Sequence, residues 1–158
     1  MNLTTIRKPD AMVNGHILDS LAVRPLISGK TLIDIGTGAG FPGLPLAISE
    51  PELAVELLDS NARKIGFVQH MIGELELSNA IAVRSRVENY APGKCFDTVI
   101  TRALASLPKF LDLASHLVAV KGVMLAQKGQ YPADELKDMP SAWGYSVTEL
   151  VVPGLKVR

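Results

Sequence analysis

Short apolar runs recur along the chain, and stretches with a different repeat separate them. The runs have the length and composition of buried strands and cover residues 31–35, 55–58, 80–83, 96–100, 122–126 and 145–152. Between several of them apolar residues recur every three or four positions, which predicts helices; examples are Ile65, Val68, Ile72 and Leu75, and Leu107, Phe110, Leu111 and Ala114. This alternation predicts an α/β fold with a mainly parallel sheet and helices on both of its faces.

Polar and proline residues beside these runs predict where helices begin and end. Asp59 or Ser60 can cap the helix that contains Ile65. An N-terminal helix is expected over residues 10–23, between Pro9 and Pro25, as a cover for the sheet. Because the chain shows no internal repeat and no long linker, we expect one domain over residues 1–158, with 1–25 as its N-terminal helical segment.

Composition places the chain among globular proteins, since 47% of its 158 residues are hydrophobic and 20% are charged. No apolar run reaches the roughly 18 residues of a membrane span, and the first ten residues lack the apolar core of a signal peptide. We therefore expect a cytoplasmic protein with no membrane partner. Cys95 is the single cysteine, which excludes an internal disulfide or a cysteine-based metal cluster, and we predict no metal site.

Net charge gives no reason to expect nucleic-acid binding, because 16 basic residues balance 16 acidic ones. Any RNA contact would have to rest on a local basic patch. The candidate pairs are Arg7 with Lys8, Arg63 with Lys64, and Arg84 with Arg86.

A glycine-rich loop follows the first apolar run and precedes a helical pattern. It reads Asp34-Ile35-Gly36-Thr37-Gly38-Ala39-Gly40-Phe41-Pro42-Gly43, and its last three glycines have the spacing of dinucleotide-binding loops. A nicotinamide-dependent oxidoreductase is therefore one interpretation. Asp34 argues against it, because a carboxylate this close to the loop would repel a pyrophosphate. S-adenosylmethionine, which carries a sulfonium and an ammonium, suits an acidic strand end better.

Asp59 ends the second apolar run and is the next acidic group of this unit. A carboxylate at that place can accept hydrogen bonds from both ribose hydroxyls of an adenosine ligand. The alternative is that Asp59 only caps the following helix, and the corresponding alternative for Asp34 is a strand-end carboxylate that bonds nearby amides. With the glycine loop upstream, we favour ligand roles for both.

The chain resembles the glucose-inhibited-division-B family of 16S ribosomal RNA guanine-N7 methyltransferases over almost its whole length. The matching stretches are Asn2-Leu3-Thr4 with Arg7, His16-Ile17-Leu18-Asp19-Ser20, the loop 34–43, Leu57-Leu58-Asp59-Ser60, Ser85-Arg86-Val87-Glu88, Thr101-Arg102-Ala103-Leu104-Ala105-Ser106-Leu107, Lys128-Gly129 and Val152-Pro153-Gly154-Leu155. The resemblance implies a Rossmann-like class I methyltransferase fold and S-adenosylmethionine as the cofactor. It implies 16S ribosomal RNA, alone or in the small ribosomal subunit, as the partner, and neither DNA nor a stable oligomer is expected.

The resemblance also assigns cofactor-binding roles by position. Gly36, Gly38 and Phe41 would line the cofactor beside Asp34, Asp59 would hold the ribose, Val87 and Glu88 the adenine end, and Arg102 the mouth of the site. Without the resemblance, Phe41 and Val87 would be interpreted as core residues and Glu88 as a solvated loop charge. Arg102 also follows the run 96–100 at the carboxyl edge of the sheet, where a cation can grip a phosphate or carboxylate; its alternative role is a surface salt bridge.

No catalytic residue is predicted, because guanine N7 has a free lone pair and needs no deprotonation. Cys95 is expected at the far end of its strand in a structural role. His16 and Asp19 lie one helical turn apart, and we favour a structural hydrogen bond that ties their helix to the sheet over an acid–base pair. Lys128 could contact RNA phosphate or lie solvated in a loop.

Members of this family usually carry a further helical segment before the Asn-Leu-Thr motif and a final strand after the Val-Pro-Gly-Leu turn. This sequence shows neither, so the fold is expected to lack both. An alternative function follows from that expectation: a non-catalytic module that retains the adenosine pocket or a partner surface.

Overall fold

The structure is a computed structural model that describes residues 13–102 and 104–153. The predictions for Arg7, Lys8, the Asn2–Thr4 motif and the start of the N-terminal helix lie outside these residues. The elements in chain order are η1 (Val13–Leu18), α2 (Asp19–Leu21), η2 (Arg24–Leu26), β1 (Thr31–Ile35), α3 (Gly43–Ser49), β2 (Ala54–Asp59), α4 (Ala62–Glu74), β3 (Ala80–Arg84), η3 (Val87–Asn89), β4 (Phe96–Arg102), α5 (Leu107–Ala114), η4 (Ser115–Leu117), β5 (Val118–Gln127) and α6 (Ala133–Lys137).

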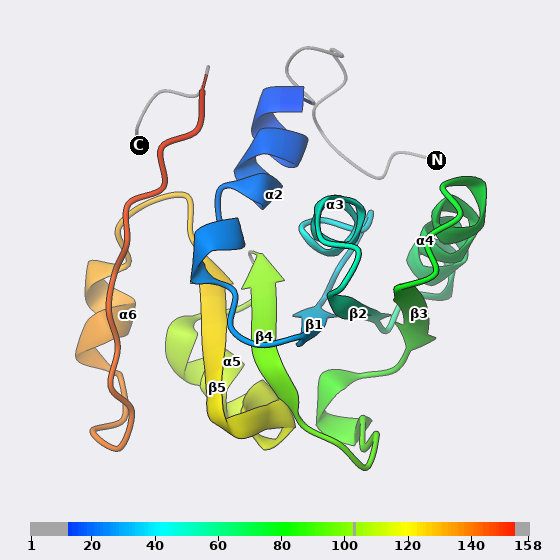
Figure 1. Cartoon of the computed structure of the whole chain (residues 1–158). Coiled ribbons are helices and arrows are strands. Elements are labelled where there is room, and N and C mark those ends of the chain that lie inside the picture. The colour runs from blue at the N-terminus through cyan, green and yellow to red at the C-terminus, as the bar shows by residue number, and fades with distance from the viewer. Residues whose placement is uncertain (1–12, 103, 154–158) are drawn as a thin grey trace.

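The five strands form one sheet in the order β3-β2-β1-β4-β5, and every neighbouring pair is parallel (Figure 1). Chain order reverses between β1 and β4, where Asp34 on β1 pairs with Leu57 on one side and Ile100 on the other. In open parallel sheets the ligand crevice lies at such a reversal, beyond the carboxyl ends of the strands. The predicted α/β fold with a parallel sheet is confirmed.

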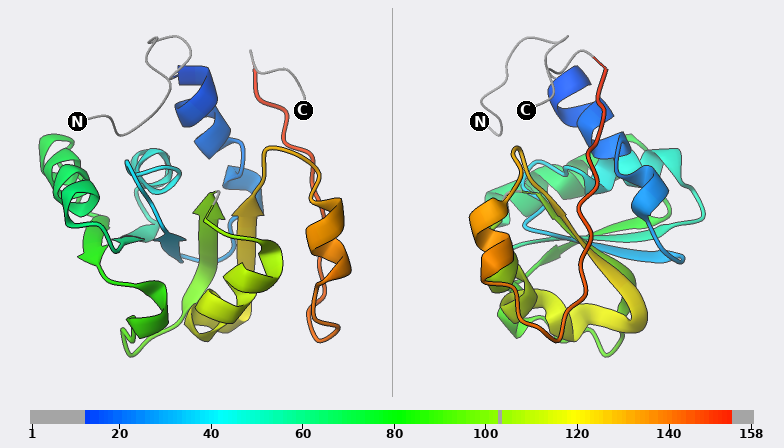
Figure 2. Two further views of the ribbon diagram at one scale, coloured as in Figure 1. Left: turned by 180° about the vertical axis from the view of Figure 1, so that it is seen from behind. Right: turned by 90° about the vertical axis from the view of Figure 1, so that its left-hand side faces the viewer.

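Helices cover both faces of the sheet, as the sequence predicted (Figure 2). On one face Leu46 of α3 and Val68 of α4 belong to a buried cluster with Leu57 of β2. On the other face Phe110 of α5 lies in a second buried cluster with Val99 of β4. Alternate strand residues therefore enter different layers, which explains why the central strands read as continuous apolar runs.

The predicted strand over residues 145–152 is wrong, because this segment makes no strand pairing and runs as irregular chain alongside α6 (Figure 1). Leu150 and Val152 pack inward, whereas Tyr145, Val147 and Val151 stay exposed. Strand-like alternation stabilises a strand only where a neighbouring strand completes the hydrogen-bond ladder, and sequence pattern does not reveal whether one is there.

Two further boundaries differ from expectation. The N-cap of α4 is Asn61, whose Oδ1 accepts hydrogen bonds from Arg63 N at 2.9 Å and Lys64 N at 3.3 Å, so neither Asp59 nor Ser60 caps the helix. Strand β5 begins four residues before the predicted start, at Val118, and a register irregularity in its pairing with β4 accommodates the extra length.

The described part of the N-terminal segment, residues 13–26, lies over the carboxyl edge of the sheet, above the tips of β4 and β5 (Figure 1). Its element α2 contacts α3, and Gln127 at the end of β5 donates a hydrogen bond to Asp19 O at 3.0 Å. This segment therefore borders the edge at which the topology places a ligand.

Candidate functional site

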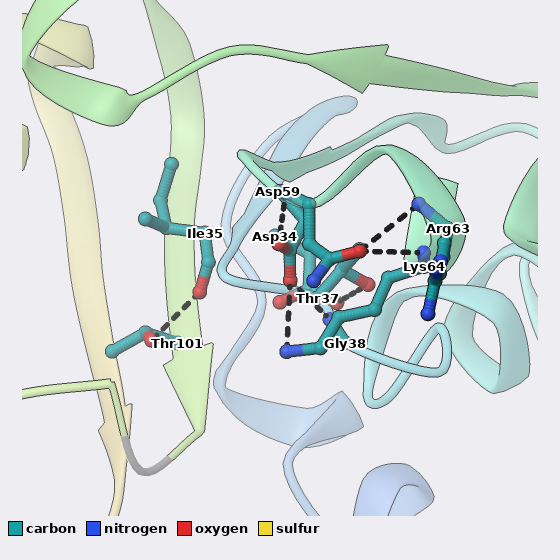
Figure 3. A network of polar contacts seen from close by, with 9 residues as sticks. Asp34, Ile35, Thr37, Gly38, Asp59, Arg63, Lys64 and Thr101 are labelled. Atoms are coloured by element: carbon teal, nitrogen blue, oxygen red, sulfur yellow. Dashed lines mark hydrogen bonds and ion pairs between the residues drawn. The ribbon is translucent and has the colours of Figure 1, made fainter. Parts of the chain in front are cut away.

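The glycine loop after β1 is fastened by the Asp34 carboxylate. Its Oδ2 accepts a hydrogen bond from Thr37 Oγ1 at 2.6 Å (Figure 3). The same oxygen accepts from Gly43 N, the first residue of α3, at 2.9 Å. A Cβ on Gly43 would lie 2.9 Å from that oxygen and 2.8 Å from a methyl of Leu57, so close packing of α3 on the sheet requires glycine here. Asp34 thus joins both ends of the loop.

Asp34 is fully buried, and its second oxygen, Oδ1, has no hydrogen-bond partner. Burial raises the pKa of this carboxyl from its ordinary value of 3.8 to about 6, although the hydrogen bonds from Thr37 and Gly43 oppose the shift. An unpaired carboxylate oxygen behind the loop makes the surroundings favourable for a cationic ligand.

Asp59 at the end of β2 fastens the same loop from its other side. Its carboxylate accepts from Gly38 N at 3.1 Å and from Asn61 N at 2.9 Å, and Lys64 Nζ lies 3.6 Å away (Figure 3). The side chain is 8% exposed. Because a carboxylate offers about four acceptor positions, this one retains capacity for a ligand hydroxyl.

A pocket of about 510 Å³ opens at this edge of the sheet. Five of the predicted site residues line it, namely Gly36, Asp59, Val87, Glu88 and Arg102. Gly36 has a left-handed φ of +69°, and a Cβ there would lie 2.8 Å from a methyl of Leu104. A second pocket, of about 480 Å³, lies beside Arg24 and Glu50, away from the glycine loop.

The three other predicted residues, Asp34, Gly38 and Phe41, lie beside the pocket instead of in its lining. Asp34 supports the loop from behind and Gly38 donates its amide to Asp59. The observed bonds of Asp34 are those of the alternative role, a strand-end carboxylate that bonds groups of its own loop, and since neither Asp34 nor Gly38 lines the pocket, Asp34 can act on a bound cation only through its charge. Sequence reasoning missed as lining residues Ile35, Leu58, Ser60, Lys64, Ser85, Arg86, Leu104 and Leu113. Most of these residues lie at or just after the ends of strands, and this position in the sequence could have identified them as lining residues.

Phe41 belongs to a cluster at the pocket mouth that joins three segments. Its ring stacks on His16, with centroids 4.9 Å apart, and the Arg102 guanidinium lies 5.4 Å from its centroid. Arg102 also bonds to Asp19 Oδ2 and to His16 Nδ1, both at 3.3 Å. Burial lowers the pKa of His16, and the nearby Arg102 charge acts in the same direction.

This cluster confirms the favoured interpretation of His16 and Asp19, since both tie the N-terminal segment to the end of β4. Arg102 does form a salt bridge, the alternative considered for it, but the pair is partly buried, with 23% of the Arg102 side chain and 27% of the Asp19 side chain exposed. Cys95 immediately precedes β4, at the opposite end of the strand from the pocket, as expected.

Within residues 13–102 and 104–153, no group of three or more His, Cys, Asp or Glu side chains is arranged to hold a metal ion. None of the helices described here has the length and apolar character needed to cross a membrane.

Comparisons with known proteins show the family that the chain matches and the fold that it shares. Residues 1–157 match the family described as rRNA small subunit methyltransferase G (GidB). Ribosomal RNA small subunit methyltransferase G of Idiomarina loihiensis is 48% identical over 155 residues, which cover 98% of this chain and 75% of that protein.

Two solved structures share the fold at low sequence identity. Coclaurine N-methyltransferase, bound to N-methylheliamine and SAH, matches with a TM-score of 0.62 at 16% identity, over 79% of this chain and 37% of that one. Precorrin-6y C5,15-methyltransferase from Geobacter metallireducens matches with a TM-score of 0.60 at 17% identity, over 87% of this chain and 72% of that one.

Proposed function

Because the chain belongs to the rRNA small subunit methyltransferase G family, we propose that it transfers a methyl group from S-adenosylmethionine to N7 of a guanine in small-subunit ribosomal RNA. The observation that carries this proposal is the pocket at the carboxyl edge, where the glycine loop and the Asp59 carboxylate meet. A related fold, that of coclaurine N-methyltransferase, holds SAH, the demethylated cofactor.

The residues of the pocket fit this cofactor chemically. Its volume of about 510 Å³ is within the usual range for sites that enclose a ligand of this size. Asp59 would accept the ribose hydroxyls, and Val87 and Glu88 would flank the adenine. Because Gly36 has no Cβ, the space next to Leu104 stays open for the cofactor. The buried charge of Asp34 favours the cationic end of S-adenosylmethionine.

When bound, S-adenosylmethionine supplies an electrophilic methyl group on a sulfonium. The protein's task is to hold the guanine in line with that methyl group, because N7 attacks with its own lone pair and no proton has to leave. This requirement agrees with the pocket lining, which among the described residues consists of one glycine, two serines and apolar and charged side chains and includes neither a cysteine nor a histidine. Arg102, fixed by Asp19 and His16, would orient the incoming nucleotide at the mouth.

RNA would reach the pocket across a basic surface formed by Arg63, Lys64, Arg84 and Arg86. Lys64 and Arg86 line the pocket itself. Arg84 ends β3 as the register partner of Asp59, and Arg63 and Lys64 begin the first turn of α4. Their side chains are partly or fully exposed, as phosphate contacts require. This small patch supports local recognition in a protein with a balanced net charge.

Calorimetric titration tests the cofactor half of the proposal. The chain should bind S-adenosylmethionine and its demethylated product but not NADH, and Asp59→Ala should weaken binding at least about 100-fold. Asp112→Ala is the matched control, because Asp112 is an exposed carboxylate on α5 that pairs with Lys109 at 2.9 Å. Binding of NADH alone would contradict the proposal.

Methyl transfer to RNA tests the other half. Radiolabel should appear in 16S ribosomal RNA, and nuclease digestion with mass spectrometry should identify 7-methylguanosine. We expect assembled small subunits to accept methyl groups faster than naked RNA, because four basic side chains give weak affinity for RNA by themselves. Cofactor binding without transfer, in a folded sample, would instead favour the non-catalytic module.

A further inference from the structure

Lys128 lies immediately after β5 and makes its contacts inside the protein. Its Nζ donates to Ala105 O at 2.7 Å and lies 2.8 Å from Glu135 Oε2. The lysine side chain is 19% exposed. The interpretation of Lys128 as a solvated loop lysine is therefore wrong, and the other interpretation, a contact with RNA phosphate, stays a prediction.

Glu135 of α6 bonds a main-chain amide as well as Lys128. Its Oε2 also accepts a hydrogen bond from Leu107 N, the first residue of α5, at 2.6 Å. The preceding residue, Ser106, occupies the N-cap position but makes no side-chain cap bond, so a carboxylate from another helix satisfies this amide. The hydrogen bond from Lys128 lowers the pKa of Glu135 below its ordinary value of 4.5, which keeps it ionised at neutral pH.

These bonds hold Ala105 and Leu107, and the segment next to them, residues 104–106, extends to the pocket. Leu104 lines the pocket and lies over Gly36, whose missing Cβ would be 2.8 Å from a Leu104 methyl. Glu135 itself does not line the pocket. It acts on the site indirectly: Glu135 bonds Lys128 and the Leu107 amide, and Lys128 in turn bonds Ala105 O.

We infer that Glu135 is a positioning residue for methyl transfer, which fixes the segment 104–106 and thereby the place of Leu104 at the pocket mouth. This inference rests on the proposed function. Because the segment follows β4 directly at the edge where substrate enters, a small displacement there would misalign the guanine more than it would weaken cofactor binding.

The first test measures the segment itself and does not depend on activity. Amide hydrogen exchange in a peptide covering residues 104–110 should become at least 10-fold faster in Glu135→Ala. Glu135→Gln should have a smaller effect, because its amide oxygen can still accept from Leu107 N. The matched control is Asp134→Ala on the same helix, whose side chain is 93% exposed and pairs with Lys137. Unchanged exchange in Glu135→Ala would overturn the inference.

The second test separates positioning from general loss of stability. With concentrations corrected for the folded fraction, Glu135→Ala should lower kcat on small subunits at least 10-fold. KM for the RNA and Kd for S-adenosylmethionine should both stay within threefold. A kcat like that of the wild type, or a loss confined to KM, would overturn the inference. If the wild-type chain transfers no methyl group, the proposed function fails, and hydrogen exchange still decides the role of Glu135.

The third test asks whether Glu135 and Lys128 act as a unit. If they do, Lys128→Met and Glu135→Gln combined should lower kcat no more than the larger single effect. If the fold-loss of kcat in the double variant equalled the product of the two single losses, the two side chains would act independently, which would contradict the inference.

Discussion

The two sides of the pocket are held together in different ways. On the loop side, residues 34–43 and 59–61, most bonds join residues close in sequence: Thr37 to Asp34 spans three residues and Asn61 to Asp59 spans two, and the longest, Gly38 to Asp59, spans 21. On the mouth side, formed by Arg102, Lys128 and their partners, most bonds span longer stretches: Arg102 to Asp19 spans 83 residues and Leu107 to Glu135 spans 28, although Lys128 to Glu135 spans only seven. One side is a local motif, whereas the other depends on the assembled fold.

This difference separates two properties of the site. Changes on the loop side should alter affinity for S-adenosylmethionine, because that side surrounds the cofactor. Changes on the mouth side should alter transfer to RNA while cofactor affinity is preserved. The following substitutions test that separation, from the largest expected effect to the smallest.

Gly36→Ala should weaken S-adenosylmethionine binding about 100-fold or more in calorimetric titration. Alanine at φ +69° costs roughly 1 kcal/mol, and its Cβ would lie in the pocket 2.8 Å from Leu104. Gly66→Ala in α4 is the control, because a Cβ there meets nothing within 4 Å and should leave affinity unchanged. If Gly36→Ala bound S-adenosylmethionine with near wild-type affinity, Gly36 would not lie against the bound cofactor.

Arg102→Lys should lower methyl transfer to small subunits by about 10- to 100-fold and change cofactor affinity less than threefold. A lysine keeps the charge but loses the planar fork that reaches Asp19 and His16 together and stacks over Phe41. The control is Arg24→Lys, whose partner Glu50 lies at the second pocket. A loss of cofactor affinity equal to the loss of transfer would contradict the separation of the two sides.

Asp34→Asn should weaken cofactor binding about 10-fold at pH 8 while making the free protein more stable. The substitution removes a buried charge that attracts the cofactor's cationic groups, and it keeps an oxygen for Thr37 and Gly43. Calorimetry gives the affinity and urea unfolding gives the stability. A variant that binds as tightly as the wild type would show that the Asp34 charge has no role in binding.

The same variant tests the pKa of Asp34. Because that pKa is raised from 3.8 to about 6 in the folded protein, the folded state holds this proton more tightly than the unfolded state. The contribution to stability is therefore complete below about pH 4 and is lost as pH rises through 6. We expect unfolding free energy between pH 4 and 7 to fall by roughly 1–3 kcal/mol more in the wild type than in Asp34→Asn. If the unfolding free energies of the wild type and Asp34→Asn changed equally with pH, the raised pKa of Asp34 would be contradicted.

Asn61→Ala should have the smallest effect on the site. Loss of the N-cap bonds to Arg63 N and Lys64 N should reduce unfolding free energy by about 1 kcal/mol. Cofactor affinity should change less than threefold, because Asp59 still accepts from the main-chain amide of residue 61. A tenfold loss of affinity would show that the cap, and not Asp59 alone, fixes the loop side.

The loop side was largely predictable from sequence. The run Asp34–Gly43, the apolar strand before it and Asp59 at the end of the next strand predicted the place of the pocket, and the structure brings Gly36 and Asp59 together there. The α4 cap shows the limit even for local contacts, since Asn61 adopts the cap geometry two residues after Asp59. Neighbouring polar residues compete for one position, and backbone conformation decides among them.

Sequence by itself determined the layers, the parallel sheet, the glycine loop and the carboxylates at its strand ends, because these follow from hydrophobic period and short-range spacing. Only the tertiary structure decided that Glu135 bonds Leu107 N and Lys128, that His16 stacks on Phe41, and that residues 145–152 pair with no strand. Those contacts join segments whose approach depends on the packing of the whole sheet and its helices. No local pattern encodes which distant partner a lysine, a carboxylate or a strand edge will meet.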